Sequence, residues 1–129
     1  MQPRTRNHHL TLVLAVCLLV GSGCTSTTEF GQPVVGTPVS VKVALDPRNT
    51  GRSLTVQGTI REVCRDEGCW FTISDSSNEI TVRYVAENGL GIPIIARGPA
   101  RVHGVIRDTV IGRNRIPEIR ADGVMLLEQ

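Results

Sequence analysis

Short segments in which apolar and polar residues alternate constrain the fold of this 129-residue chain more than any other feature. Successive side chains of a β-strand point to opposite faces, so a period of two predicts strands with one buried face. The clearest such segment covers 54–61, and turn-forming Gly, Pro, Asn, Asp and Ser separate it from its neighbours. The alternation predicts strands over 39–45, 54–61, 70–74, 80–84, 100–106 and 116–127.

The connections between these segments indicate how the strands are joined. Residues 75–78 predict a turn and 108–114 a hairpin loop, whereas 85–96 breaks the alternation and predicts a short helical turn and loop. The five segments from residue 54 onward give three meander strands, an irregular connection and a two-strand hairpin, which is the order of an OB-fold barrel. A β-sandwich is the alternative, but five strands are few for two sheets. We therefore expect an all-β, five-stranded OB-fold-like barrel with a short helical turn between strands three and four.

The residues of these strands also resemble the strands of OB-fold families. The similar segments are Val56–Ile60, Phe71–Asp75, Ile80–Val82, Val102–Ile106 and Glu118–Asp122. The alternation places one parity inside the barrel. The residues expected there are Leu54, Val56, Ile60, Phe71, Ile73, Ile80 and Val82.

The N-terminus predicts an export signal. Arg4 and Arg6 precede an apolar run over 10–20, which is well short of the roughly twenty residues that span a bilayer. Small residues then stand directly before Cys24. This arrangement resembles the lipobox of bacterial lipoproteins, in which Cys24 would be the acylated residue. The alternatives are cleavage without acylation and an uncleaved membrane anchor.

This interpretation divides the chain into three parts. We predict a lipoprotein signal peptide over 1–23, a flexible tether rich in Ser, Thr, Gly and Pro over 24–38, and the barrel domain over 39–129. Acylation attaches a protein to a membrane through lipid, without a protein span. The expected location is therefore the cell envelope, facing the periplasm or the cell exterior.

The charge balance bears on the class of partner. Beyond Cys24 the chain has 12 Lys and Arg residues against 12 Asp and Glu residues. Proteins that bind nucleic acid usually need an excess of cations to displace phosphate counterions. We therefore expect an envelope protein or a small ligand as partner, and no nucleic acid.

Two cysteines, Cys64 and Cys69, lie in the connection that leads to the only tryptophan, Trp70. In an oxidising compartment they predict a disulfide across the mouth of a hairpin. Closing so short a loop stabilises by about 2 kcal/mol in the chain-entropy model. The alternative is a copper or zinc site that uses both thiolates and His103, with no cofactor otherwise. A redox dithiol is disfavoured because acidic residues between the cysteines raise thiol pKa values.

The same loop resembles a narrower group of proteins. Gly58–Cys64 followed by Gly68–Cys69–Trp70 is similar to the signature of the domain-of-unknown-function 4920 family. These are small bacterial exported or lipid-anchored proteins without an established activity. The resemblance therefore implies a fold and a compartment, and no reaction.

The outward parity of the strands suggests a binding surface. OB-folds commonly bind ligands across strands two and three, where Trp70 and Arg83 are suited to stack a sugar, a peptide or a base. A solvated face with Trp70 covering the barrel end is the alternative. The sequence shows no Ser–His–acid grouping, phosphate loop or paired carboxylates, so we expect a binding module and no enzyme. The predicted ligand-binding residues are Trp70, Thr72, Arg83, Arg101 and His103.

Overall fold

The computed structural model describes residues 26–66, 68–86, 89 and 91–127. The predicted signal peptide and its lipidation residue, Cys24, lie outside these ranges. Within them, no helix has the length and apolar character needed to cross a membrane.

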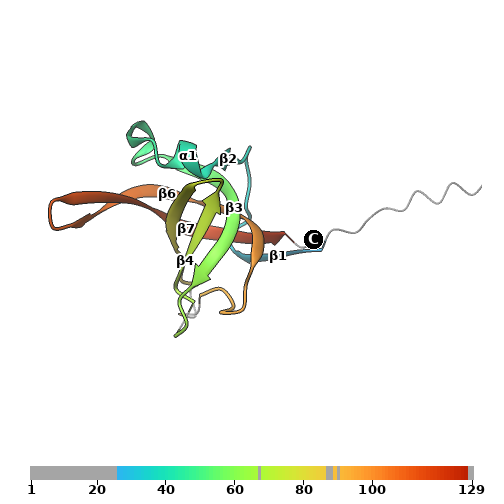
Figure 1. Cartoon of the computed structure of the whole chain (residues 1–129). Coiled ribbons are helices and arrows are strands. Elements are labelled where there is room, and N and C mark those ends of the chain that lie inside the picture. The colour runs from blue at the N-terminus through green and yellow to red at the C-terminus, as the bar shows by residue number, and fades with distance from the viewer. Residues whose placement is uncertain (1–25, 67, 87–88, 90, 128–129) are drawn as a thin grey trace, which may run out of the picture.

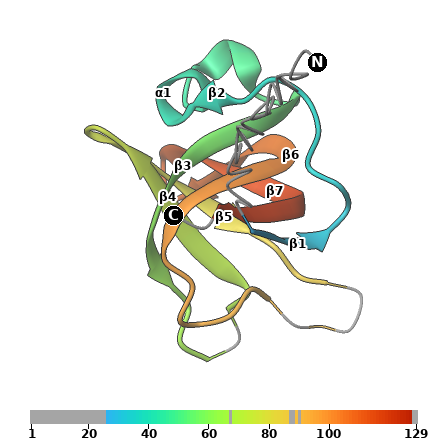
Figure 2. The same ribbon diagram turned by 90° about the vertical axis from the view of Figure 1, so that its right-hand side faces the viewer.

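Five strands close a barrel in the predicted order (Figures 1 and 2). A meander of β3 (Ser53–Val63), β4 (Trp70–Asp75) and β5 (Asn78–Arg83) is followed by a hairpin of β6 (Gly98–Ile111) and β7 (Asn114–Leu127). β5 runs parallel to β7, and β6 pairs antiparallel with β3, so that each of the five strands pairs with two others of the five. The prediction of an all-β, five-stranded OB-fold-like barrel is confirmed.

The barrel interior contains the residues that the alternation predicts. Each of these side chains gains roughly 1.5–3 kcal/mol from burial relative to exposure. Leu54 is half-buried at the edge of this core. The fully buried members of the predicted set are Val56, Ile60, Phe71, Ile73, Ile80 and Val82.

The strand predicted over 39–45 is wrong beyond its first two residues. β2 (Val39–Ser40) pairs parallel with β3, and the chain then turns into α1 (Val41–Ala44) and a 3₁₀ helix, η1 (Pro47–Asn49). The Ser40 hydroxyl caps α1 by accepting from the Val43 N–H at 3.3 Å.

A contact distant in sequence explains why α1 replaces the predicted strand. The Asp75 carboxylate, at the end of β4, accepts a hydrogen bond from the Val41 N–H at the start of α1. Val41 and Ala44 lie on one face of the helix and are fully buried against the barrel. Local alternation cannot reveal either partner.

Part of the segment predicted as a flexible tether is a strand. β1 (Thr27–Gly31) pairs antiparallel with the end of β7, from Thr27 opposite Leu127 to Gly31 opposite Gly123. The N–H of Gln32 then donates to the Asp122 carbonyl at 2.8 Å. Main-chain hydrogen bonds to β7 therefore order residues that the composition of the segment predicts to be flexible.

The β6–β7 hairpin is longer than the sequence predicts. The expected loop over 108–114 is a two-residue turn at 112–113, and the hairpin projects beyond the barrel (Figure 1). A shift of register between His103 and Gly104 gives β7 one extra residue, Asp122. The bulge lies next to Gly123, within the strand that the alternation predicts over 116–127.

The connection between β5 and β6 forms single turns. The N–H of Gly89 donates to the Ala86 carbonyl, and that of Ala96 to the Pro93 carbonyl, each at 2.9 Å. These i to i+3 bonds are the form that the predicted helical turn takes, and no helix is assigned to the described part of this connection.

Candidate functional site

The predicted ligand-binding residues lie on two walls of the barrel. Trp70 and Thr72 belong to β4, and Trp70 stands directly opposite Arg83 of β5. Arg101 and His103 belong to β6, which pairs with β3 and β7 and not with β4 or β5. The structure therefore brings Trp70, Thr72 and Arg83 together and separates them from Arg101 and His103.

A row of large side chains crosses the first wall. Trp70 is paired with Arg83, and Arg83 is paired with Arg120 of β7. We call this outer surface of β4, β5 and β7 the Trp70 wall. The parallel pairing of β5 with β7 brings Arg120 into it, and the sequence interpretation did not include that residue.

A second row, beside the first, contains a buried carboxylate. Thr72 is paired with Thr81, and Thr81 with Glu118, whose side chain is only 4% exposed. Arg83 Nε donates to Glu118 Oε2 at 2.8 Å, and Arg120 Nε lies 2.9 Å from Glu118 Oε1. Glu118 thus holds both arginines of the Trp70 wall. The only local signal in the sequence was that Glu118 stands two residues before Arg120, which places both side chains on the same face of one strand.

The charge state of Glu118 results from opposing effects. Burial raises the pKa of Glu118, whereas hydrogen bonds from Arg83 and Thr109 and the charges of Arg83 and Arg120 lower it. The net pKa lies below the ordinary value of 4.5, so Glu118 is ionised at neutral pH. Its two guanidinium partners are therefore held by charge as well as by geometry.

Thr72 lies beneath the exposed part of this wall. Its side chain is buried, and its hydroxyl oxygen has no hydrogen-bond partner among the described residues. Ser74, two residues further along β4, is also buried and accepts a hydrogen bond from Arg61 Nε at 2.7 Å. The Arg61 side chain therefore reaches Ser74 from β3, and Trp70 and Arg83 are more accessible than Thr72 and Ser74.

The second wall has its own polar pairs. His103 Nδ1 lies 2.7 Å from Asp122 Oδ1, on the bulge of β7. Arg101 Nε donates to Gln57 Oε1 of β3 at 2.9 Å. His103 Nδ1 and Arg101 Nε, which belong to two of the predicted ligand-binding residues, are therefore already engaged in contacts within the protein.

The two cysteines flank the connection between β3 and β4. Cys64 directly follows β3 and Cys69 directly precedes β4, and both are half-buried. The Cys64 N–H donates to the Trp70 carbonyl at 2.9 Å, which closes the hairpin mouth. A disulfide between them stays a prediction.

The third ligand of the alternative metal site is far from the cysteines along the sheet. His103 is paired with Thr55, near the opposite end of β3 from Cys64. In the ranges that the structure describes, no three side chains of His, Cys, Asp or Glu form a cluster able to hold a metal ion. The arrangement does not bring His103 to the cysteine pair.

Comparison with known proteins gives information on the fold alone. No family model and no curated protein matches the chain. A solved structure titled "putative aspartyl-tRNA synthetase", from Leishmania major Friedlin, is similar with a TM-score of 0.55 and 13% sequence identity. The similarity covers 77% of this chain but only 24% of that one. It shows that a barrel of similar fold occurs within a much longer protein.

Proposed function

We propose that this chain is a non-enzymatic binding module of the cell envelope that binds a protein or a small ligand through the Trp70 wall. The observation that carries this proposal is the buried Glu118, which fixes two arginines in a row with Trp70. A buried carboxylate is costly unless it is paired, and the two arginines supply the charges that pair with Glu118.

The exposed ends of the arginines support a binding role. The side chains of Arg83 and Arg120 are 44% and 61% exposed, although each uses its Nε toward Glu118. A guanidinium group has further N–H donors that can bind a carboxylate or another polar acceptor. The indole of Trp70 adds a flat surface on which a sugar or a peptide group can stack. Because the arginines are already held in place, binding would order little additional structure.

Replacement of Trp70 tests this proposal. We expect Trp70→Ala to weaken binding about 30-fold, the effect of losing a central aromatic contact worth about 2 kcal/mol. Trp70→Phe keeps an aromatic face and should retain most of the affinity. Trp70 is the only tryptophan, so its fluorescence in the wild type reports on this wall directly during titration with acidic dipeptides and oligosaccharides.

The matched control changes the other wall. Arg101→Ala removes an arginine that is paired with Gln57 on β3 and should leave the binding unchanged. A pull-down from envelope extract gives the corresponding test for a protein partner. Equal capture by wild type and Trp70→Ala, or equal losses in Trp70→Ala and Arg101→Ala, would contradict the proposal.

Envelope attachment is the second part of the proposal. We propose that Cys24 is acylated, on the basis of the N-terminal sequence. β1 begins at Thr27, so at most about 11 Å of extended chain separates the two Cα atoms. An acyl chain on Cys24 would therefore hold the barrel close to the membrane surface.

A further inference from the structure

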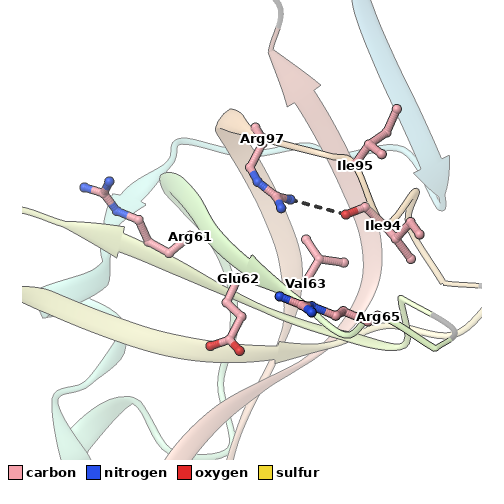
Figure 3. Close-up of a pocket in the computed structure, with 7 residues that line it drawn as sticks. All are labelled: Arg61, Glu62, Val63, Arg65, Ile94, Ile95 and Arg97. Carbon is pink, nitrogen blue, oxygen red and sulfur yellow. Dashed lines mark hydrogen bonds between the residues drawn. The ribbon is translucent and has the colours of Figure 1, made fainter.

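A cleft opens between two loops at the end of the barrel that the cysteines occupy. Its volume is about 560 Å³, and it lies between the end of β3 with the β3–β4 connection on one side and the β5–β6 connection on the other. In Figure 3 the guanidinium groups of Arg65 and Arg97 both point toward Val63. We call it the arginine cleft. It is lined by Arg61, Glu62, Val63, Arg65, Ile94, Ile95 and Arg97.

The two loops are held together by main-chain contacts. The Ile92 N–H donates to the Gly68 carbonyl at 3.2 Å, and Ile92 itself is buried. A Cβ on Gly68 would lie 2.1 Å from the Ile92 carbonyl oxygen, and Gly68 has a φ of 62°. Only glycine accommodates both the positive φ and the close approach of the Ile92 carbonyl oxygen. The loops therefore present the walls of the cleft in a defined relation.

The arginines of the cleft have no carboxylate partner in the part of the chain that the structure describes. Elsewhere, Arg48, Arg83, Arg115 and Arg120 form ion pairs. Among the described residues no carboxylate lies within ion-pair distance of the three cleft arginines, all of which are exposed. Glu62 is the only acidic residue among the described residues that line the cleft, so this lining has an excess of positive charge.

Two isoleucines project beside these charges. Ile94 is 51% exposed and Ile95 is 81% exposed, on the turn that the Ala96 N–H closes by donating to the Pro93 carbonyl. Arg97 Nη1 also donates to the carbonyls of Ala96 and Ile94, at 2.6 and 3.3 Å. These hydrogen bonds fix the backbone of the turn and leave both apolar side chains in water.

We propose that the arginine cleft and its two isoleucines dock on an anionic phospholipid surface. Charge complementarity carries the choice, because uncompensated arginines attract lipid phosphates and anionic headgroups. Apolar side chains beside cationic ones are the composition of segments that lie in the membrane interface. A soluble phosphate would account for the arginines but not for the exposed isoleucines. The contact does not depend on a ligand at the Trp70 wall.

Vesicle binding measures this docking directly. The probe is the chain from residue 24 onward with Cys24→Ala, so that no acyl chain contributes. We expect it to co-sediment with phosphatidylcholine vesicles that contain phosphatidylglycerol, and far less with phosphatidylcholine alone. Binding should fall as salt is raised, because the screening length shortens from about 10 Å at 0.1 M to about 3 Å at 1 M.

Substitutions identify the cleft as the contact. Arg65→Ala with Arg97→Ala should lower partition about 30-fold, or roughly fivefold for each charge, which corresponds to about 1 kcal/mol per arginine near the surface. Lysine at the same two positions should retain most of the binding, because attraction to a membrane surface depends on the positive charge more than on bidentate hydrogen-bond geometry. Ile94→Ser with Ile95→Ser should lower binding at an unchanged net charge. Thermal unfolding checks that each variant folds.

The matched control removes two charges elsewhere. Arg113→Ala with Arg115→Ala changes the tip of the β6–β7 hairpin by the same net charge and should leave partition within about twofold, since charges beyond a Debye length are screened. Equal losses in both double variants would overturn the proposal. So would absent wild-type binding, full competition by soluble glycerol phosphate, or equal affinity for an acidic peptide. Trp70→Ala should still bind vesicles, which separates this test from that of the proposed ligand.

Discussion

Glu118 connects the charge of the Trp70 wall to the stability of the barrel. Its side chain is nearly inaccessible, and two strands contribute the arginines that compensate it, Arg83 from β5 and Arg120 from β7 itself. Because Arg83 is also the neighbour of Trp70, loss of the carboxylate would release the residue on which the proposed ligand surface depends.

Replacement of Glu118 has an effect that depends on pH. The folded pKa of Glu118 is lowered, so its ionised form stabilises the protein above about pH 4.5, and this contribution is lost as pH falls further. Glu118→Gln should lower the free energy of unfolding at pH 7 by about 1–3 kcal/mol. It should also flatten the loss of stability in acid, measured by urea unfolding across a pH series.

An exposed carboxylate supplies the control for Glu118. Glu79 lies on β5 and forms no ion pair within the described ranges, so Glu79→Gln should retain the wild-type acid profile. Some acid sensitivity remains in every variant, because hydrogen bonds from Arg48 hold the pKa of Asp46 at about 2. Superimposable profiles for Glu118→Gln and wild type would show that the arginines do not depend on Glu118.

Two elements set the shape of the molecule around this wall, the β6–β7 hairpin and the β3–β4 connection. The bulge in the hairpin shifts the pairing by one residue, and Asp122 then reaches His103 while Arg120 stays beside Arg83. Gly104 of β6 faces the backbone of β7 at this point. A Cβ there would lie 2.3 Å from the Arg120 carbonyl oxygen.

Gly104→Ala should therefore disrupt the bulge. We expect a loss of about 3 kcal/mol in unfolding free energy, because backbone atoms on β7 must move. Gly112→Ala, at the open hairpin turn with a φ of 63°, meets no atom within 4 Å and should cost only about 1 kcal/mol of backbone strain. Chemical denaturation of the two variants compares them. Similar losses of unfolding free energy in the two variants would mean that the β7 backbone at Arg120 moves at little cost.

The β3–β4 connection tests the cysteine prediction. If Cys64 and Cys69 form a disulfide, replacement of both by serine should lower the stability of oxidised protein by about 2 kcal/mol and leave reduced protein nearly unchanged. Unfolding with and without reductant, together with a thiol titration, gives the answer. Two titratable thiols with stoichiometric copper or zinc in protein from the envelope would favour the metal alternative.

On the scale of the whole molecule, the N-terminal segment belongs to the barrel from β1 onward. β1 covers the edge of β7, and Phe30 packs against the core. The proposed acyl anchor would therefore act on a barrel held close to the bilayer, where the arginine cleft has a surface to meet.

Acylation predicts a defined behaviour in cells. Wild-type protein should incorporate labelled palmitate and sediment with membranes, whereas Cys24→Ala should do neither. Cys17→Ala is the control, because Cys17 lies within the apolar run of the predicted signal. Unlabelled, soluble wild-type protein would refute the lipid anchor.

The candidate site was only partly accessible from sequence. Alternation correctly assigned Trp70 to the outward face and Phe71 to the core, because the direction of a side chain on a strand depends on its position in the local sequence. It could not show that Arg101 and His103 face a different wall, because that depends on strand order. The arginine cleft was missed because alternation along β3 cannot show that Arg65 and the 94–97 turn, which come from two separate loops, lie beside the end of that strand.

The sequence by itself determined the all-β class and the residues of the barrel core, because a period of two and its turns are written in neighbouring residues. Tertiary structure alone decided that 41–44 is a helix, that Thr27–Gly31 is a strand, and that Glu118 joins Arg83. Each of these depends on a partner distant in the chain: Asp75, the end of β7, or the parallel register of β5 with β7. Hydrogen bonds and ion pairs formed across such distances outweigh local propensity, and they place the charges on which both proposals depend.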